Sequence, residues 1–436
     1  MGTFIPNTRE EQKSMLAEIG YSNLEELFKD IPSECIFKGE LNIPKGKSEL
    51  EVVREIEKIA DKNKLYKKIF RGAGAYYHYI PAIVDTVSNK EEFLTSYTPY
   101  QAEISQGILQ SIFEYQTMMC ELTGMETSNA SVYDGCSAAA EACTMCRERK
   151  RAKIYISETV DPRTVKTICT YNFGSGAETI MIPKVNGETD INKLKEMLDD
   201  ESACLVIQQP NYFGVLEDVD KISTIVHEAG AKLIMSCNPI SLGLLKTPEE
   251  YGVDIAVGDG QPLGLGLAYG GPYLGFMTTT KKMFRKLPGR IVGETFDKKG
   301  ERGFVLTLQA REQHIRREKA SSNICSNQAL CALKVAVYLA AVGQKGINEV
   351  AVQCTSKAHY LQKGLGEVGL KLEYDKPFFH EFVTTSSDSN KLLKALDKKG
   401  ILGGLPLEDN RILWCTTEMA TKEDMDELIA VAKEVN

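Results

Sequence analysis

A helix start between Tyr133 and Cys146 has residue types that are suited to binding an anion. In its sequence, YDGCSAAAEACTMC, a glycine precedes small polar and apolar residues that would open a helix. Backbone N–H groups at such a start, with the hydroxyl of Ser137, could face a phosphate. The alternative is a closely packed helix N-terminus whose alanines face a sheet. Both interpretations stay open, because helix N-termini bind anions only where one is presented.

A second glycine-rich run, from Val257 to Phe276, superficially resembles a dinucleotide-binding fingerprint. It reads VGDGQPLGLGLAYGGPYLGF and contains GLGLAYG. The fingerprint must follow a strand and open a helix, whereas this run leads into the strand pattern PYLGFMTT and has different glycine spacing. We therefore predict no NAD site here.

The 12 cysteines are scattered along the chain, and only Cys143 and Cys146 form a CxxC pair. That pair lies inside a helical pattern, with no second pair or nearby histidine to complete a zinc set. We therefore expect reduced thiols on a helix face and no metal site.

The elements that would position these motifs alternate between helix and strand from about residue 97. Short, continuously apolar strands between helices predict a mostly parallel sheet that is covered on both faces. The core is therefore expected to be a doubly wound α/β domain. The expected strands are 152–157, 178–184, 202–211, 232–237, 254–259 and 272–279, and the expected helices are 108–123, 163–171, 191–199 and 221–229.

The flanking regions have different patterns. Residues 8–30 predict one or two short helices with Thr8 and Ser22 as N-caps, and residues 48–63 predict an amphipathic helix. A long apolar helix is expected from Gln328 to Val342, followed by a small α+β region. We thus predict an N-terminal helical and extended segment at 1–95, a large α/β domain at 96–330 and a small C-terminal α+β domain at 331–436.

Charge and hydropathy exclude several classes of protein. The net charge is −8, without a basic stripe, which argues against nucleic acid or anionic membrane as a partner. The first residues carry charges where an export signal needs an apolar run. The apolar stretch from Ala329 to Val342 is too short to span a bilayer and contains Lys334. We expect a cytoplasmic protein.

Three long motifs are specific enough to identify a family. They are FRGAGAYYHYIP at 70–81, SYTPYQAEISQG at 96–107 and LPGRIVGETFDKKGERGFVLTLQAREQHIRREKASSNICSNQAL at 287–330. Together they resemble the α subunit of glycine decarboxylase, the P-protein of the glycine cleavage system, over nearly the whole chain. The resemblance implies a fold-type I PLP-transferase-like fold. It also implies glycine dehydrogenase (aminomethyl-transferring) activity in a complex with a β subunit, which decarboxylates glycine and passes the aminomethyl group to the lipoyl arm of H-protein.

The same resemblance implies that PLP is not bound covalently to this chain. In the PLP-carrying half of the family, His-Lys-Thr precedes the glycine-rich stretch, and anchoring on Gly-Gly-Pro at 270–272 places Gln261 at the position of the Schiff-base lysine. An amide cannot form an imine with the cofactor aldehyde. The strand that should supply an acid for the pyridinium nitrogen ends at Ser236 and Cys237 instead. Lys246 precedes the strand and would lie on its wrong side, so PLP is expected on the partner β subunit.

Several residues are candidates for a site shared with that partner. The resemblance implies that Ser321, Ser322 and Asn323 contact the phosphate of the partner's PLP. Tyr97, Tyr100, His314 and Arg317 are candidates for the catalytic interface, with Arg311 expected on the same helix as His314. Tyr76, Tyr77 and His78, from the aromatic loop, are further candidates. Alternatively, the basic residues pair with Glu312 and Glu318 on a solvated or interface helix.

Two other functions remain to be weighed. A self-sufficient PLP lyase or aminotransferase, acting as a homodimer, would need an anchoring amine that the sequence does not provide. A structural or regulatory pseudoenzyme would contribute no residue to any active site.

Overall fold

The computed structural model describes residues 7–94, 96, 100–320, 322–324 and 328–435. The chain divides into two compact units, Met1–Leu65 and Tyr66–Asn436. The sequence predicted domain boundaries after residues 95 and 330 instead. Those boundaries stay predictions.

The first unit contains two short α-helices. α1 (Arg9–Glu18) begins at Thr8, whose side chain forms a capping box with Glu11, as the sequence predicted. The other expected N-cap, Ser22, is wrong: Asn23 caps η1 (Leu24–Phe28), because its side chain accepts the backbone N–H of Glu26. A further 3-10 turn, η2 (Ser33–Cys35), interrupts the expected extended region. The amphipathic helix α2 (Glu49–Ala60) is confirmed, with Ser48 as its N-cap.

A seven-stranded sheet forms the centre of the second unit. Five neighbouring strands run parallel, whereas β10 is antiparallel to both β9 and β2. The mostly parallel α/β fold predicted from the sequence is therefore confirmed. In spatial order the strands are β2 (Thr127–Ser128), β10 (Gly275–Thr279), β9 (Ile255–Asp259), β8 (Lys232–Cys237), β7 (Ser202–Gln209), β3 (Lys153–Ser157) and β4 (Thr179–Ile182).

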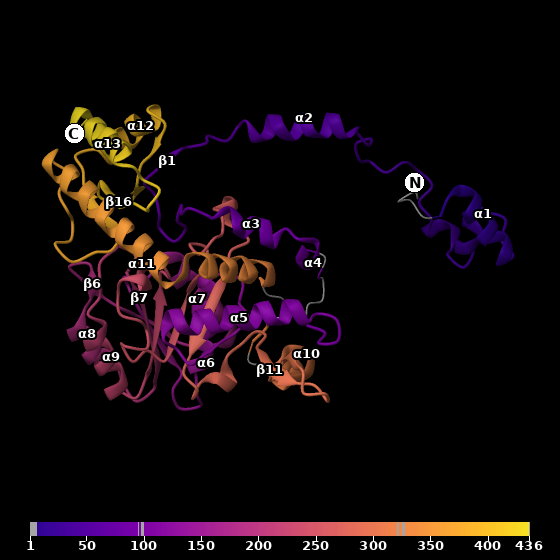
Figure 1. Ribbon diagram of the computed structural model, residues 1–436, viewed down its shortest axis with the longest axis horizontal. Coiled ribbons are helices and arrows are strands. Elements are labelled where there is room, and N and C mark those ends of the chain that lie inside the picture. The colour runs from indigo at the N-terminus through magenta and orange to yellow at the C-terminus, as the bar shows by residue number, and fades with distance from the viewer. Residues whose placement is uncertain (1–6, 95, 97–99, 321, 325–327, 436) are drawn as a thin grey trace. The chain divides into compact units, whose positions relative to one another are not determined.

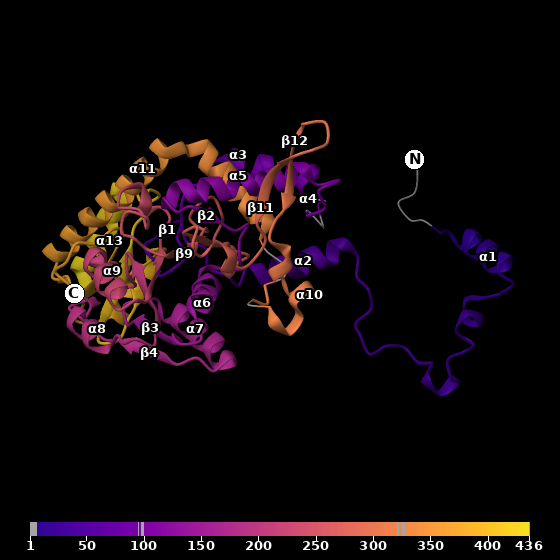
Figure 2. The ribbon, with the colours of Figure 1, turned by 90° about the horizontal axis from the view of Figure 1, so that it is seen from below.

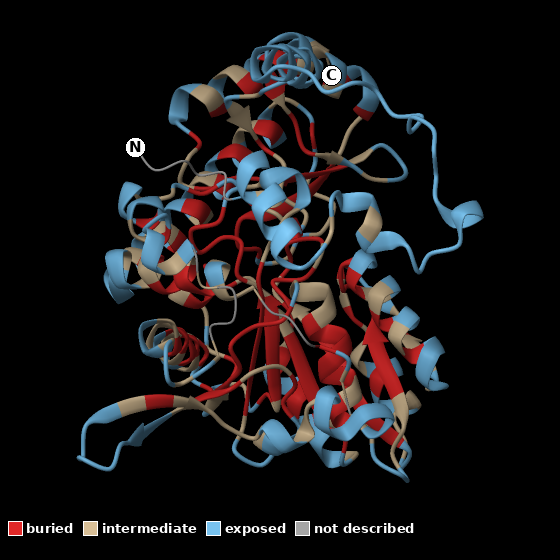
Figure 3. Ribbon diagram, turned by 90° about the vertical axis from the view of Figure 1, so that its right-hand side faces the viewer, coloured by how far each residue is buried: buried red, intermediate tan, exposed pale blue. Residues whose placement is uncertain are grey.

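Alternate residues of each central strand enter opposite cores, because side chains in a strand point to opposite faces. Tyr155 and Leu205 pack with helices α5, α9 and α11 on one face. Ile154 and Val206, their neighbours, pack with α6 and α7 on the other face. Figure 3 shows the strands buried between helices whose outer surfaces are exposed. This two-sided burial explains why the strands read as continuous apolar runs.

Several helices of the second unit lie around this sheet, whereas α12 and α13 lie beside the C-terminal strands (Figure 1). The α-helices are α3 (Ala82–Ser88), α4 (Glu91–Leu94), α5 (Gln106–Thr123), α6 (Gly135–Cys146), α7 (Pro162–Ser175), α8 (Ile191–Met197), α9 (Val219–Glu228), α10 (Gln313–Arg316), α11 (Ala329–Glu367), α12 (Ser389–Lys398) and α13 (Lys422–Val435). The 3-10 turns are η3 (Ser241–Gly243), η4 (Ala268–Gly270), η5 (Phe284–Lys286), η6 (Gln309–Arg311) and η7 (Arg317–Lys319).

The C-terminal region forms a separate small sheet with its own core. Its strands follow the order β13 (Glu381–Thr385), β16 (Arg411–Cys415) and β15 (Leu405–Pro406), covered by α12 and α13 around the buried Trp414. The short β1 (Lys68–Ile69) pairs in parallel with β14 (Ile401–Leu402), so the start of the second unit joins its C-terminal part.

Two short hairpins complete the strands. They are β5 (Lys184–Val185) with β6 (Glu188–Thr189), and β11 (Val292–Phe296) with β12 (Arg302–Leu306). Figure 2 shows that β11 and β12 project from the body of this unit.

Helix α11 is longer than the sequence predicted. It continues to Glu367 but has non-helical backbone at Gly343, where φ is 62°. Among the described residues it is the one helix that is long and apolar enough to cross a membrane. Val335 and Tyr338 pack in the main core, and Leu361 packs in the C-terminal core. Helix α11 therefore contributes side chains to both the main core and the C-terminal core.

Candidate functional site

A cavity of about 280 Å³ opens at the carboxyl ends of the central parallel strands. It lies beyond Gln208 of β7, Ser236 of β8 and Asp259 of β9. The first turns of α6 and α7 and the loop around Tyr76 complete its wall. Open α/β sheets bind ligands at this edge, because the loops and helix starts converge there.

The start of α6 is occupied by the chain's own carboxylates. Asp134 caps the helix by accepting the backbone N–H of Ser137 at 2.7 Å. Asp259 accepts the backbone N–H of Gly135 at 3.1 Å. A Cβ atom on Gly135 would lie 2.9 Å from the backbone nitrogen of Asp259, so only glycine allows this approach. The structure therefore favours close packing, and not an added phosphate, at this helix start.

Four carboxyl groups contribute to the lining of the cavity. Asp134, Asp161, Asp259 and Glu381 all contribute to it, and the guanidinium of Arg163 pairs with Asp161. Burial raises the pKa of Asp259 to about 6 and that of Glu381 to about 7. The N–H of Ala73 and the hydroxyl of Tyr76 oppose this shift at Glu381 by donating hydrogen bonds to its carboxyl.

The Gln261 side chain is buried and fully engaged. Its Oε1 accepts the backbone N–H of Tyr76 at 2.8 Å. Its Nε2 donates to the backbone oxygens of Tyr76 at 2.9 Å and Leu265 at 2.8 Å. This amide therefore fastens the aromatic loop to the glycine-rich run, a structural task that the sequence did not reveal.

Lys246 lies away from the cavity. Its Nζ is 2.9 Å from a carboxylate oxygen of Asp220, and its side chain is half exposed. Among the described residues that line the cavity, none is a lysine.

These residues do not fit PLP. The cofactor would need an amine for its aldehyde, free N–H groups for its phosphate and an acid at the end of β8. At the position expected for the amine stands Gln261, whose amide is hydrogen-bonded within the chain. Carboxylates occupy the start of α6, and Ser236 stands at the end of β8 where the acid is needed.

The predicted interface residues are not brought to this cavity. Tyr100 lies under the guanidinium of Arg290, whose central carbon is 4.8 Å from the ring centre. His314 is exposed, with Nδ1 3.4 Å from Glu312. Arg317 is exposed and has a positive φ of 53°. None of the three lines the cavity. Tyr97 lies outside the described residues.

The residues predicted to contact the phosphate of the partner's PLP also do not line this cavity. Ser322 accepts the backbone N–H of Ile324 at 3.1 Å. A hydrogen bond from Ser322 also lowers the pKa of Glu141, although burial dominates and raises that pKa to about 7. Asn323 is exposed. Ser321 lies outside the described residues.

The expectation that Arg311 and His314 share one helix is wrong. Glu312 separates η6 from α10 with an extended ψ of 154°. Arg311 donates to the backbone oxygens of Leu287 and Gly289, and Glu312 pairs with Arg290. Glu312 was expected as an alternative partner for the basic residues of the predicted helix. It pairs with Arg290 instead.

The aromatic loop lies inside the second unit. The Tyr76 hydroxyl donates to Glu381 at 2.8 Å, and its ring lines the cavity. The backbone oxygen of Tyr77 accepts the hydroxyl of Thr417 at 2.5 Å. His78 is buried, with Nδ1 2.7 Å from Glu418. The Tyr76 hydroxyl, the backbone oxygen of Tyr77 and one ring nitrogen of His78 are thus engaged within this chain.

Comparison with known proteins decides the family. The sequence profile described as glycine cleavage system P-protein matches residues 2–432. The chain belongs to the glycine cleavage system P-protein family. Relatives described as probable glycine dehydrogenase (decarboxylating) subunit 1 include one from Carboxydothermus hydrogenoformans, 49% identical with 98% of each chain covered. Another, from Desulfitobacterium hafniense, is 47% identical with 99% of each covered.

Solved structures agree with this P-protein assignment. A crystal structure of glycine decarboxylase (P-protein) of the glycine cleavage system, in an inhibitor-bound form, has a TM-score of 0.93. It is 42% identical, with 100% of both chains covered. A sphingosine-1-phosphate lyase from Burkholderia pseudomallei has a TM-score of 0.66 at 15% identity, covering 93% of this chain and 96% of its own. That similarity shows the fold alone, which is the fold-type I architecture that the sequence predicted.

The acidic residues that line this P-protein cavity were not predicted from the sequence. Asp161, Asp259 and Glu381 come from three distant segments, and no local motif joins them. A usable signal did exist for Asp259, since it ends an apolar strand, and the ends of parallel strands meet at one edge of a sheet.

Proposed function

We propose that this chain is the non-cofactor-anchoring subunit of a two-subunit glycine decarboxylase. The observation that carries the proposal is a P-protein match along the whole chain together with a cavity that lacks an anchoring lysine among its described residues. The chain acts with a β subunit on glycine and with lipoylated H-protein, which receives the aminomethyl group. Its location is cytoplasmic.

PLP belongs to the β subunit in this proposal. When bound there, it supplies the electron sink that decarboxylation requires. This chain supplies groups at the shared interface that bind, orient and exclude water. The acid-lined cavity of the chain itself takes no part in cofactor anchoring.

Asn323 and Arg317 are the strongest interface candidates on this chain. Both are exposed, and the described residues show no side-chain hydrogen bond for either. An amide donor and a guanidinium are suited to a phosphate or carboxylate. Tyr100, His314 and Ser322 are weaker candidates because each has a contact within the chain, as do Tyr76 and His78.

The deciding experiment is glycine-dependent exchange of labelled CO₂ in the presence of H-protein. The chain is assayed alone, with added PLP, and with its β subunit. Activity only in the reconstituted mixture supports the proposal. Activity of the lone chain with PLP would overturn it and favour a self-sufficient PLP enzyme.

Asn323→Ala and Arg317→Ala then separate an active-site contribution from pure scaffolding. Losing a hydrogen bond to a charged group removes about 1.5–3 kcal/mol, which is a rate loss of about 10- to 100-fold. Lys299→Ala, in the exposed turn between β11 and β12, is the matched control. Unchanged turnover in both variants, with assembly intact, would instead assign the chain a structural role.

A further inference from the structure

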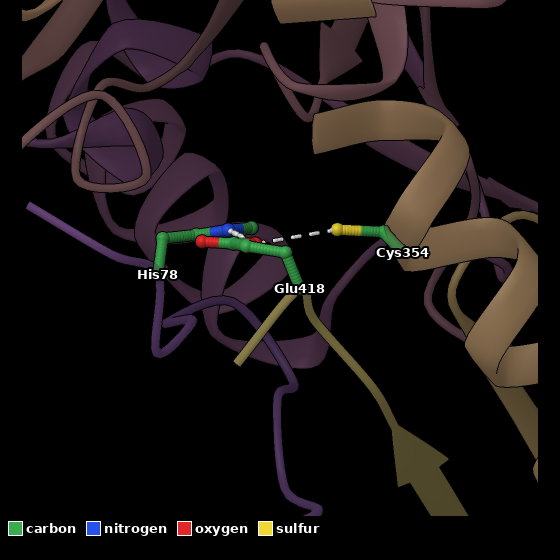
Figure 4. A group of neighbouring side chains, drawn as sticks. All are labelled: His78, Cys354 and Glu418. Carbon is green, nitrogen blue, oxygen red and sulfur yellow. Dashed lines mark hydrogen bonds and ion pairs between the residues drawn. The ribbon is translucent and has the colours of Figure 1, made fainter. Parts of the chain in front are cut away.

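Three side chains with metal-ligating atoms converge outside the acid-lined cavity. They are His78, Cys354 and Glu418, and Figure 4 shows them pointing toward one another. His78 lies in the aromatic loop, Cys354 on α11, and Glu418 beyond the end of β16. Nδ1 of His78 is 2.7 Å from Oε2 of Glu418, and Sγ of Cys354 is 3.6 Å from the same oxygen.

One of these separations already matches a tetrahedral zinc site, one is shorter, and all three ligand atoms lie within 4.8 Å of one another. Zinc–nitrogen and zinc–oxygen bonds of about 2.0 Å and zinc–sulfur bonds of about 2.3 Å imply ligand separations of about 3.6 Å for sulfur and oxygen. The observed sulfur–oxygen distance already has this value. For nitrogen and oxygen the same geometry requires about 3.3 Å. The hydrogen bond between His78 and Glu418 must therefore lengthen by about 0.6 Å as the ion replaces its proton.

The charges of the cluster suit a buried divalent cation. His78 and Cys354 are buried, and the Glu418 side chain is only 15% exposed. One thiolate and one carboxylate neutralise Zn²⁺ completely, which limits the cost of placing charge away from water. Lys357 donates through Nζ to the backbone oxygen of Glu418 at 2.5 Å.

A further cavity reaches the cluster at Glu418, the one of the three residues that lines it. It has a volume of about 360 Å³, and Glu418 contributes to its lining together with Tyr79, Pro81, Tyr338 and Met419. An ion could enter by this route, and a water molecule from it could complete the coordination. Three protein ligands with one water form a standard zinc environment.

We propose that His78, Cys354 and Glu418 bind one zinc ion, with water as the fourth ligand. Binding forms the zinc–sulfur bond as the thiol of Cys354 releases its proton to solvent, with no change of oxidation state. The proton that Nδ1 of His78 shares with Glu418 in the metal-free chain moves to Nε2, so that Nδ1 presents its lone pair to the ion. Nε2 has no hydrogen-bond partner among the described residues, so the new N–H is left unpaired and its cost is set against the three bonds to zinc.

The site would join three parts of the second unit that are far apart in sequence. His78 and Glu418 are separated by 340 positions, and Cys354 and Glu418 by 64. Metal binding would hold the aromatic loop against α11 and the segment that follows β16. The sequence analysis expected no metal site, because no local spacing brings these ligands together.

The test is a titration of the chelator-treated full-length chain with cobalt(II), followed by displacement with zinc. We expect one equivalent to bind and to give a thiolate-to-cobalt charge-transfer band that zinc abolishes. Cys354→Ser should remove the band, and Glu418→Gln should weaken binding by about 100-fold or more, since loss of even a supporting contact costs 10- to 100-fold. Circular dichroism checks that both variants are folded.

Cys146→Ser is the matched control, because Cys146 is another buried thiol, on α6. It should keep the band and the stoichiometry. An absent band in the wild-type chain would overturn the proposal, and so would a band that survives Cys354→Ser. The readout needs neither glycine nor a second subunit, so it stands apart from the proposed function.

Discussion

The carboxylate of Asp259 links the end of β9 to the start of α6. Oδ2 accepts the backbone N–H of Gly135 at 3.1 Å, and Oδ1 accepts the backbone N–H of Gln261 at 2.9 Å. One side chain thus satisfies two backbone donors beside the acid-lined cavity.

Asp259→Ala is expected to destabilise the protein. The substitution leaves two partly buried N–H groups without an acceptor, and each costs about 1–3 kcal/mol. We expect the free energy of unfolding to fall by about 3 kcal/mol, measured by urea denaturation. Asp259→Asn keeps one acceptor oxygen but turns its NH₂ toward the other N–H donor, so it should cost about 2 kcal/mol. Equal stability of the alanine variant and the wild type would show that these hydrogen bonds contribute nothing net.

Gln261→Leu tests the structural task of the buried amide. Leucine has a similar size but no polar atoms. It leaves three backbone groups unpaired: the N–H and the oxygen of Tyr76, and the oxygen of Leu265. We expect a loss of about 3 kcal/mol or more in urea denaturation. Faster proteolysis within residues 70–81 should accompany it. Gln353→Leu, on the exposed surface of α11, serves as the control and should leave both measurements nearly unchanged.

Glu381 should make stability depend on pH. In the unfolded chain its carboxyl ionises near pH 4.5, whereas burial raises the folded pKa to about 7. Between these values the native state binds more protons than the unfolded state, so the free energy of unfolding falls as pH rises. The contribution is present below pH 4.5 and is lost by about pH 7.

Glu381→Gln should remove this dependence. The free energy of unfolding of the wild type relative to the variant is expected to drop by roughly 3 kcal/mol between pH 4.5 and 7. Urea denaturation at several pH values measures it, with Glu196→Gln as an exposed control. A difference that stays constant across this range would contradict the raised pKa of Glu381.

The isolated chain is expected not to retain PLP. No lysine lines the cavity among its described residues, and the first turn of α6 is capped by carboxylates. After incubation with PLP and gel filtration, absorbance should show no stoichiometric cofactor, whereas the β subunit treated alike should retain it. Gln261→Lys should not restore binding, because Asp134 and Asp259 still occupy the phosphate position. Retention of one equivalent by the wild-type chain would refute this prediction.

The sequence by itself determined the type of most elements and the family. Apolar runs predicted the buried strands, Thr8 marked a helix start, and apolar spacing predicted the helix over 48–63, because periodicity and capping are local properties of the chain. The absence of a lysine at position 261 was likewise readable without coordinates. The local rule failed at Ser22, where neighbouring Asn23 took the cap, and at Arg311 and His314, where extended backbone at Glu312 broke the helix.

Only the tertiary structure decided which distant side chains meet. Sheet order places Asp259 against Gly135, and packing of α11 brings Cys354 to His78 and Glu418. It also showed that the polar groups of Tyr76 and Gln261 are held within the chain. These contacts depend on strand order and on the packing of helices against the sheet. Neither leaves a periodic signal in the sequence, because the residues that meet come from segments far apart in the chain, each with its own local pattern.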